Sequence, residues 1–223
     1  MTLAAIDALA RLRRLGKPVF TTADASLSLG LRRPAATKAL SRLARAGLVL
    51  PLRRALWSLE SDIDPLRLPE ALTSPHPAYV SLQTALHLHG MITQVPQVVF
   101  VASLAPTHTV TTRVGVFSIH RLSPWFFGGF ETMPDGIRLA TAEKALLDTL
   151  YLAPARSRAF AALPEVEIPT RFDRAVARRW ISRIRSQPRR RLVEARLATL
   201  LATATAGPAR ARQGTAARRR RRR

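Results

Sequence analysis

The sequence predicts an α+β protein with a helical N-terminal domain, a mixed α/β C-terminal domain and a disordered, arginine-rich tail. Three observations support this prediction. Apolar residues recur at helical spacing over residues 3–46, strand-forming runs follow in the middle of the chain, and the end of the chain holds no large apolar side chain. We place the first domain at residues 1–60, a linker at 61–77, the second domain at 78–206 and the tail at 207–223.

Two helices are predicted first. One covers residues 3–15, where a leucine or isoleucine stands at every third position, and Gly16 ends it. In the other, Thr21 or Thr22 can accept a hydrogen bond from the backbone of the first turn. Gly30 supplies the turn that closes this second helix.

A third helix and a hairpin complete the N-terminal domain. The helix is expected over residues 33–46, with Pro34 at the first position, where its missing N–H breaks no helical hydrogen bond. Residues 48–50 and 55–59 have the composition of strands around a turn at 51–54. Three helices followed by a hairpin in this order predict a winged helix-turn-helix.

The second domain is expected to combine short strands with helices. The linker before it is rich in aspartate and proline and has room for one short helix. The strands are expected at residues 98–101, 109–112, 114–120 and 137–139, and the helices at 82–89, 142–152, 170–186 and 189–204.

The positive charge of the chain is concentrated at its two ends. The formal net charge is +22. Residues 1–59 carry 11 basic and 2 acidic side chains, residues 60–150 carry 5 and 8, residues 151–206 carry 12 and 4, and residues 207–223 carry 8 and none. The ends therefore suit a polyanion such as DNA, and the middle suits packing or a protein partner.

The third helix has one apolar face and one cationic face. The apolar face, expected to pack on the first two helices, holds Ala36, Ala39, Leu40 and Leu43. An α-helix fits the major groove of DNA, where arginine and lysine can bond to guanine edges, and a basic wing tip suits phosphates or the minor groove. We therefore expect double-stranded DNA to contact nine residues, namely Arg32, Arg33, Thr37, Lys38, Ser41, Arg42, Arg45, Arg53 and Arg54.

Position along the helix suggests a role for each of these residues. The start of a recognition helix usually reaches bases and its later turns reach phosphates. Arg33, Thr37 and Lys38 are therefore assigned to bases, and Arg42 and Arg45 mainly to phosphates. A winged helix that makes only protein contacts is the alternative interpretation of the same pattern.

Several other function classes find no support in the sequence. There is no cysteine, no apolar run near the roughly 20 residues that span a bilayer, and no recognisable secretory signal. A glycine-rich phosphate loop is absent, and the histidines lack the spacing of helical metal ligands. We expect no enzyme activity, metal, cofactor or membrane partner, and a cytoplasmic protein that is nucleoid-associated when bound to DNA.

One enzymatic alternative rests on Asp135, Glu143 and Lys144. These residues superficially match the acidic and lysine positions of metal-dependent nucleases. That chemistry requires glutamate and lysine two apart on a strand, whereas these two are adjacent beyond a predicted helix cap and diverge by about 100°. Helix capping, with an ion pair between Lys144 and Asp148 four residues apart, is the competing interpretation.

Two groups of residues resemble the AbiEi-type antitoxins, which are also described as transcriptional regulators of viral defence systems. The first group lies in residues 20–24, 29–31, 40–43 and 46–49, and the second in residues 79–82, 85–86, 89–90, 94–96, 137 and 140–148. The first pattern is common to many winged helices. The second, YxSLxxALxxHG followed by ATxEKALLD, is more specific, and the resemblance covers about residues 1–155.

The resemblance implies a bacterial antitoxin of a type IV toxin–antitoxin pair, in an abortive-infection operon for phage defence. Its winged helix would repress its own operon at promoter inverted repeats, and its C-terminal domain would be needed for antitoxicity. The partner would be a cognate nucleotidyltransferase-like toxin. Ala55 departs from the pattern, because the wing of the family normally carries glycine there. A stand-alone transcriptional regulator without a toxin is the alternative.

Overall fold

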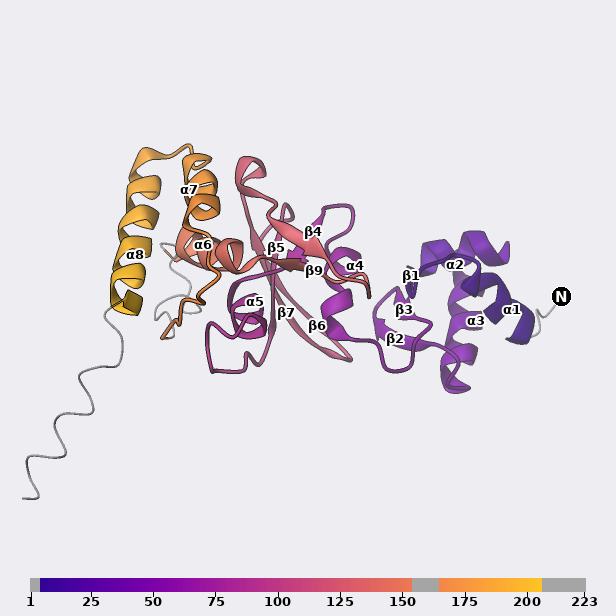
Figure 1. The fold of residues 1–223 in the computed structure, drawn as a ribbon. Helices are drawn as coiled ribbons and strands as arrows, with labels where there is room; N and C mark the ends of the chain where they lie inside the picture. Colours follow the sequence, from indigo (N-terminus) through magenta and orange to yellow (C-terminus); the bar gives the residue numbers. More distant parts are fainter. Residues whose placement is uncertain (1–4, 154–164, 206–223) are drawn as a thin grey trace, which may run out of the picture. The chain divides into compact units, whose positions relative to one another are not determined.

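The computed structural model describes residues 5–153 and 165–205 and has a mixed α+β architecture (Figure 1). The predicted arginine-rich tail lies outside the described residues. The helices are α1 (Ala5–Arg13), α2 (Thr22–Leu29), α3 (Arg33–Arg45), α4 (Pro69–Thr73), α5 (Leu82–Leu88), α6 (Ala142–Leu152), α7 (Arg174–Ser182) and α8 (Gln187–Thr205), with short 3-10 turns η1 (Pro65–Arg67) and η2 (Pro124–Phe126). The strands are β1 (Val19–Thr21), β2 (Leu50–Arg53), β3 (Leu56–Ser58), β4 (Ala78–Val80), β5 (Val99–Ser103), β6 (His108–Thr112), β7 (Gly115–Arg121), β8 (Phe130–Thr132) and β9 (Arg138–Ala140).

The elements from α1 to β3 enclose one apolar core. The core includes Ala8, Leu12, Phe20, Ala25, Leu29, Ala39, Leu40, Leu43, Val49 and Trp57. The predicted apolar face of α3 is confirmed, because all four of its residues are buried. Ile6 in α1 does not follow the expected spacing, since 83% of it is exposed. A step of three residues advances 300° around a helix, so Ile6 has rotated away from the fully buried Leu12.

The hairpin has a tighter turn than the sequence predicts. β1, β3 and β2 form an antiparallel sheet in that order. The expected turn at 51–54 is wrong, because β2 continues to Arg53 and the turn consists of Arg54 and Ala55. β2 is an edge strand, where Pro51 is tolerated, and the burial of Leu52 keeps this segment extended against the core.

A second, mixed sheet has the strand order β6-β7-β5-β4-β9-β8. β6 pairs with β7 and β4 with β5 in antiparallel fashion, whereas β5–β7 and β4–β9 are parallel pairs. β4 and β8 were not expected from the sequence. Each has only three residues, which is too short for an alternating pattern to be recognised.

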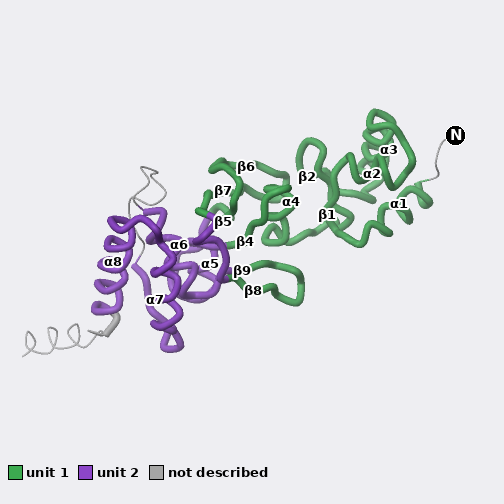
Figure 2. The backbone as a smooth tube through the Cα atoms, turned by 90° about the horizontal axis from the view of Figure 1, so that it is seen from above, with its two compact units in different colours: residues 1–80, 97–123, 130–139 green, residues 81–96, 124–129, 140–223 purple. Residues whose placement is uncertain are grey.

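The chain divides into two compact units that are not consecutive in sequence (Figure 2). Unit 1 comprises residues 1–80, 97–123 and 130–139, and unit 2 comprises residues 81–96, 124–129 and 140–223. The sequence-based domain boundaries stay a prediction, and these units describe where contacts concentrate.

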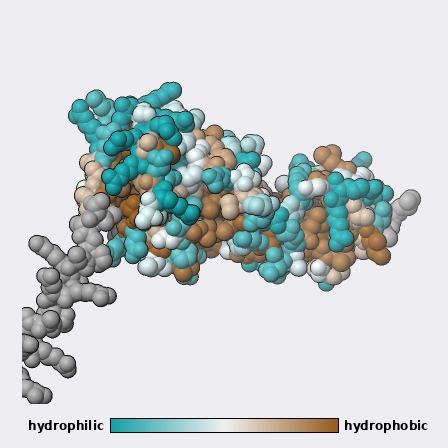
Figure 3. Space-filling model, in the orientation of Figure 1, coloured by the Kyte–Doolittle hydropathy of each residue, from teal (hydrophilic) through white to brown (hydrophobic). Residues whose placement is uncertain are grey.

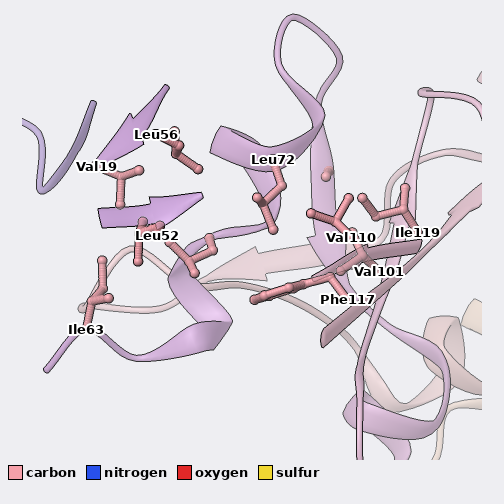
Figure 4. Packing of buried hydrophobic residues seen from close by; sticks show 11 residues of the cluster. Val19, Leu52, Leu56, Ile63, Leu72, Val101, Val110, Phe117 and Ile119 are labelled. Atoms are coloured by element: carbon pink, nitrogen blue, oxygen red, sulfur yellow. The ribbon is translucent and has the colours of Figure 1, made fainter. Parts of the chain in front are cut away.

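An apolar cluster within unit 1 joins the small sheet to the larger one (Figure 4). Val19, Leu52 and Leu56 come from β1 to β3, while Val101 and Phe117 come from β5 and β7. The segment expected as a linker contributes Ile63, Leu68 and Leu72 to the same cluster, so it is packed. The backbone N–H of Arg113 also donates to the carbonyl of Leu52 at 2.9 Å.

Unit 2 is built around α6, which contacts α5, α7 and α8. Every residue of α6 from 144 to 152 is buried. α7 begins at Arg174, later than expected, because Asp173 caps it by accepting hydrogen bonds from Ala175 and Val176. α8 includes Pro188, which stands in its first turn, where proline is tolerated. Among the described residues, no helix is both long and apolar enough to cross a membrane.

Candidate nucleic-acid interface

The cationic face of α3 is positioned by the burial of the opposite face. Ala36 and Leu40 are fully buried, and Leu43 is 2% exposed. Arg32 occupies the N-cap position without a side-chain cap, and Pro34 stands in the first turn. The helix therefore starts where the sequence predicts and presents a fixed set of side chains to solvent.

The structure places all but one of the nine predicted contact residues in exposed positions. Ser41 is half-buried, and the exposed residues are Arg32, Arg33, Thr37, Lys38, Arg42, Arg45, Arg53 and Arg54. The Thr37 hydroxyl donates to the carbonyl of Arg33 at 3.0 Å, and Arg45 Nε donates to the carbonyl of Ser41 at 3.4 Å. Within residues 5–153 and 165–205, no acidic side chain forms an ion pair with any of the seven cations. Their contact with DNA stays a prediction.

A groove of about 650 Å³ separates the start of α3 from the β2–β3 turn. Four predicted contact residues, Arg33 and Thr37 on one side and Arg53 and Arg54 on the other, line it. The remaining lining residues are Thr21, Thr22, Ala23, Ala55, Leu56, Trp57, Ala71 and Leu72. The later cations of α3 do not line this groove. Hydrophilic residues are visible over this part of unit 1 in Figure 3.

Hydrogen bonds to α2 fix the turn that forms one wall of the groove. The Trp57 indole Nε1–H donates to the Thr22 hydroxyl at 3.0 Å, and the Thr22 N–H donates to the carbonyl of Ala55 at 3.0 Å. Ala55 has a φ of 61°, in the left-handed region that glycine prefers. Sequence reasoning missed the hydrogen bond between Trp57 and Thr22, which are 35 residues apart, because no local pattern links them.

The start of α2 is closed by a capping box. The Asp24 N–H donates to the Thr21 hydroxyl at 3.1 Å, and the Asp24 carboxylate accepts from the Thr21 N–H at 2.7 Å. Burial raises the pKa of the Asp24 carboxyl, but the hydrogen bonds from Thr21 and the Lys17 ammonium outweigh it and hold the pKa below its usual value. Thr21 is thus the cap, of the two residues that the sequence allowed.

A second group of charged side chains lies inside unit 2. Lys144 and Asp148 are fully buried and form an ion pair one helical turn apart on α6, which confirms the predicted pair. The Ser81 hydroxyl donates to the other carboxylate oxygen of Asp148 at 2.7 Å, and Lys144 Nζ lies 4.2 Å from the centre of the Phe126 ring. Burial lowers the pKa of the Lys144 amine, and the nearby Asp148 carboxylate opposes that shift.

The three residues on which the nuclease alternative rests, Asp135, Glu143 and Lys144, are all engaged in contacts within the fold. Lys144 is engaged with Asp148, and Glu143 accepts a hydrogen bond from the Asp173 N–H at 2.9 Å. Asp135 accepts one from the Ile137 N–H at 3.1 Å. In the described part of the chain, no three His, Cys, Asp or Glu side chains are grouped as metal ligands.

The two motifs that carry the specific part of the resemblance meet in unit 2. Ser81 of the first motif bonds to Asp148 of the second, and His89 Nε2 lies 2.7 Å from the carbonyl oxygen of Ala140. Ser81 and Asp148 are fully buried. The motifs therefore hold α5 and α6 together. A comparison of the chain with protein-family models finds no match, and a comparison with curated proteins finds none either.

Proposed function

We propose that the chain is a DNA-binding autorepressor of the antitoxin type, and that α1 to β3 form a winged helix-turn-helix. The observation that carries the proposal is the exposed cationic surface of α3 and the β2–β3 turn, whose seven cations have no acidic partner among the described residues. A polyanion with the width of a DNA duplex can neutralise several of them at once.

Each part of this surface has a place on DNA in the proposed complex. α3 enters the major groove, where Arg33, Thr37 and Lys38 reach base edges. Arg42 and Arg45, one and two turns further along, bind phosphates. The β2–β3 turn binds phosphates or the minor groove beside α3, so that the groove between them receives one sugar–phosphate strand.

The antitoxin part of the proposal rests on unit 2. The two motifs that resemble the AbiEi-type antitoxins pack against each other there, as expected if they maintain a shared fold. Because Ser81, Lys144 and Asp148 of these motifs are buried, a nucleotidyltransferase-like toxin would be neutralised through other, more exposed residues of the chain. The protein would act in the bacterial cytoplasm, within a phage-defence operon.

A mobility-shift experiment tests DNA recognition. We expect the full chain to bind its own promoter, at inverted repeats, more tightly than a random duplex of equal length at two salt concentrations. Arg42→Ala is expected to weaken binding with the fold intact, and Arg121→Ala, which removes an exposed cation from β7, serves as the control. Equal affinity for promoter and random DNA would reject sequence-specific repression.

Co-expression tests the antitoxin assignment. We expect the neighbouring reading frame to encode a toxin whose growth arrest is relieved by this chain. If no such gene exists and the promoter is still bound, the protein is a stand-alone regulator. Relief of toxicity without promoter binding would separate the two activities.

A further inference from the structure

Arginine and aromatic side chains are paired in unit 2 around the turn between α7 and α8. The pairs are Arg183 over Trp180 at 4.2 Å, Arg185 over Trp125 at 4.4 Å and Arg189 over Tyr151 at 4.9 Å, each measured from the guanidinium carbon to the ring centre. We call these six residues the guanidinium–aromatic surface. Tyr151 is buried, whereas Arg183 and Arg185 are exposed and Trp125 is 40% exposed. The part of this surface that is open to a ligand is therefore the part around Trp125 and these two arginines.

Two rings of this surface, those of Tyr151 and Trp180, are held by a rigid base. The buried Phe126 stacks on Tyr151 at 4.4 Å with an interplanar angle of 23°, and it meets Trp180 edge-on at 6.0 Å. A Cβ on Gly129 would lie 2.8 Å from Trp180, so only glycine leaves room for the indole there. The rings of Tyr151 and Trp180 are therefore fixed before any ligand arrives, which lowers the entropic cost of binding.

The surroundings of these pairs are strongly cationic. Exposed arginines on α7, α8 and the turn between them are Arg174, Arg178, Arg179, Arg183, Arg185 and Arg191. Among the residues that the structure describes, none of them is in an ion pair with an acidic side chain. Hydrophilic surface gathers around this turn at the upper left of Figure 3. The partner is therefore expected to be an anion with many charges.

We propose that the guanidinium–aromatic surface binds single-stranded nucleic acid. Unpaired bases expose flat faces that stack on aromatic rings and on guanidinium planes, while the phosphates between them attract the neighbouring cations. In a duplex the base faces are covered by their neighbours, so a duplex can use only the charges of this surface. The paired rings and guanidinium groups thus favour single strands over duplexes.

A lipid surface fits the same region less well. Membrane-binding helices combine basic residues with an exposed apolar face that enters the lipid. In α7, Ala177 and Ile181 are buried, as is Ile184 directly after it, and Val176 and Trp180 are half-buried. The small Ala175 is the apolar residue of this helix that is exposed. This helix therefore has cations for an anionic surface but no apolar face to insert.

The experiment uses the full chain and three labelled probes, namely a 12-nucleotide oligouridylate, a 12-nucleotide oligothymidylate and a 12-base-pair DNA duplex. Affinity is measured by fluorescence anisotropy at about 0.3 M salt, which weakens contacts made by charge alone. We expect Trp125→Ala to reduce affinity for the single strands about fivefold or more, and to leave affinity for the duplex unchanged. Tighter binding of the uridylate probe identifies RNA as the ligand, and tighter binding of the thymidylate probe identifies DNA.

A matched pair of arginine variants separates stacking from charge. Arg185→Lys keeps the charge but removes the planar group over Trp125, whereas Arg178→Lys makes the same change where no ring is adjacent among the described residues. We expect only Arg185→Lys to weaken single-strand binding. Circular-dichroism melting curves check that both variants fold.

Three results would overturn this inference. One is an equal loss of single-strand and duplex affinity in Trp125→Ala, which would show that the surface binds nucleic acid through charge alone, without base stacking. Another is an unchanged single-strand affinity in both Trp125→Ala and Arg185→Lys. The third is binding of vesicles with anionic lipid that depends on Trp125 while oligonucleotide binding does not. None of these results concerns α3, so promoter binding can succeed or fail independently.

Discussion

Two cationic regions of this chain differ in what surrounds their charges. On α3 and the β2–β3 turn, seven cations lie in solvent without an acidic partner among the described residues. In α6, Lys144 is fully buried and paired with Asp148. A charge in solvent is available to a ligand, whereas a buried charge is used by the fold. A cationic side chain is therefore accessible to a ligand in the first region and engaged in internal contacts of the fold in the second.

A substitution should therefore change the free energy of unfolding more in the buried pair than on the exposed surface. Removing one partner of a buried pair leaves the other charge without compensation in a medium of low dielectric constant. Removing a solvated cation changes stability little, because its field is already screened. The following predictions test this difference, beginning with the largest expected effect.

Lys144→Met should lower the free energy of unfolding by about 3–5 kcal/mol, because Asp148 would keep its buried charge without its cation. Urea unfolding followed by circular dichroism measures the loss. Lys38→Met on α3, an exposed position, is the matched control and should change stability by less than about 0.5 kcal/mol.

The double variant Lys144→Met with Asp148→Leu sharpens this test. Replacing both charges by apolar groups should recover most of the stability, since neither charge must then be desolvated. If the single variant costs no more than the Lys38 control, the Lys144 ammonium is not buried in solution.

His120 extends the comparison to a buried titratable group. Burial lowers its pKa to about 4, from a usual value of 6.5. Between these values the unfolded chain binds a proton that the folded chain does not, so stability falls as the pH drops from 6.5 to about 4, by at most roughly 3 kcal/mol. Urea unfolding at pH 7 and pH 5 measures the change. His120→Gln should flatten it, and His108→Gln, at an exposed position, should not. The same pH dependence in all three proteins would contradict the prediction.

Arg33→Ala tests the exposed surface. It should raise the promoter dissociation constant by about five- to 150-fold and relax specificity at one base pair, because a base-edge contact is lost.

Arg45→Ala should weaken binding to every duplex and reduce the salt slope by about one. Titrations over a range of salt measure both. Neither change should alter the unfolding free energy, and a loss of stability like that expected for Lys144→Met would show that these cations support the fold.

Ala55→Gly has the smallest expected effect and tests the shape of the exposed surface. Ala55 has a left-handed φ, which glycine adopts without steric cost, so the variant should gain about 0.5–1 kcal/mol. Ala46→Gly is the control, because Ala46 has a φ of −82° and should lose stability by a similar amount. Thermal melting compares the two. A loss of stability in Ala55→Gly would mean that the turn does not hold this conformation.

Some of the site could be predicted because it depends on local geometry. The period of the helix fixes which side chains of α3 share a face, so the buried Leu40 and the exposed Arg42 follow from spacing alone. The same reasoning paired Lys144 with Asp148, four residues apart. Helix ends also follow from local chemistry, as the Thr21 cap of α2 shows.

The sequence by itself therefore determined the helices, the two faces of α3 and the concentration of charge at the ends of the chain. Only the tertiary structure decided that the Lys144–Asp148 pair is buried against Ser81, 67 residues away from Asp148. It also decided that Arg33 and Arg54 line the same groove, and that three-residue segments such as β4 are strands. The physical reason is that burial, strand pairing and grooves depend on residues distant in sequence, whereas helical periodicity and capping depend on neighbours within one turn.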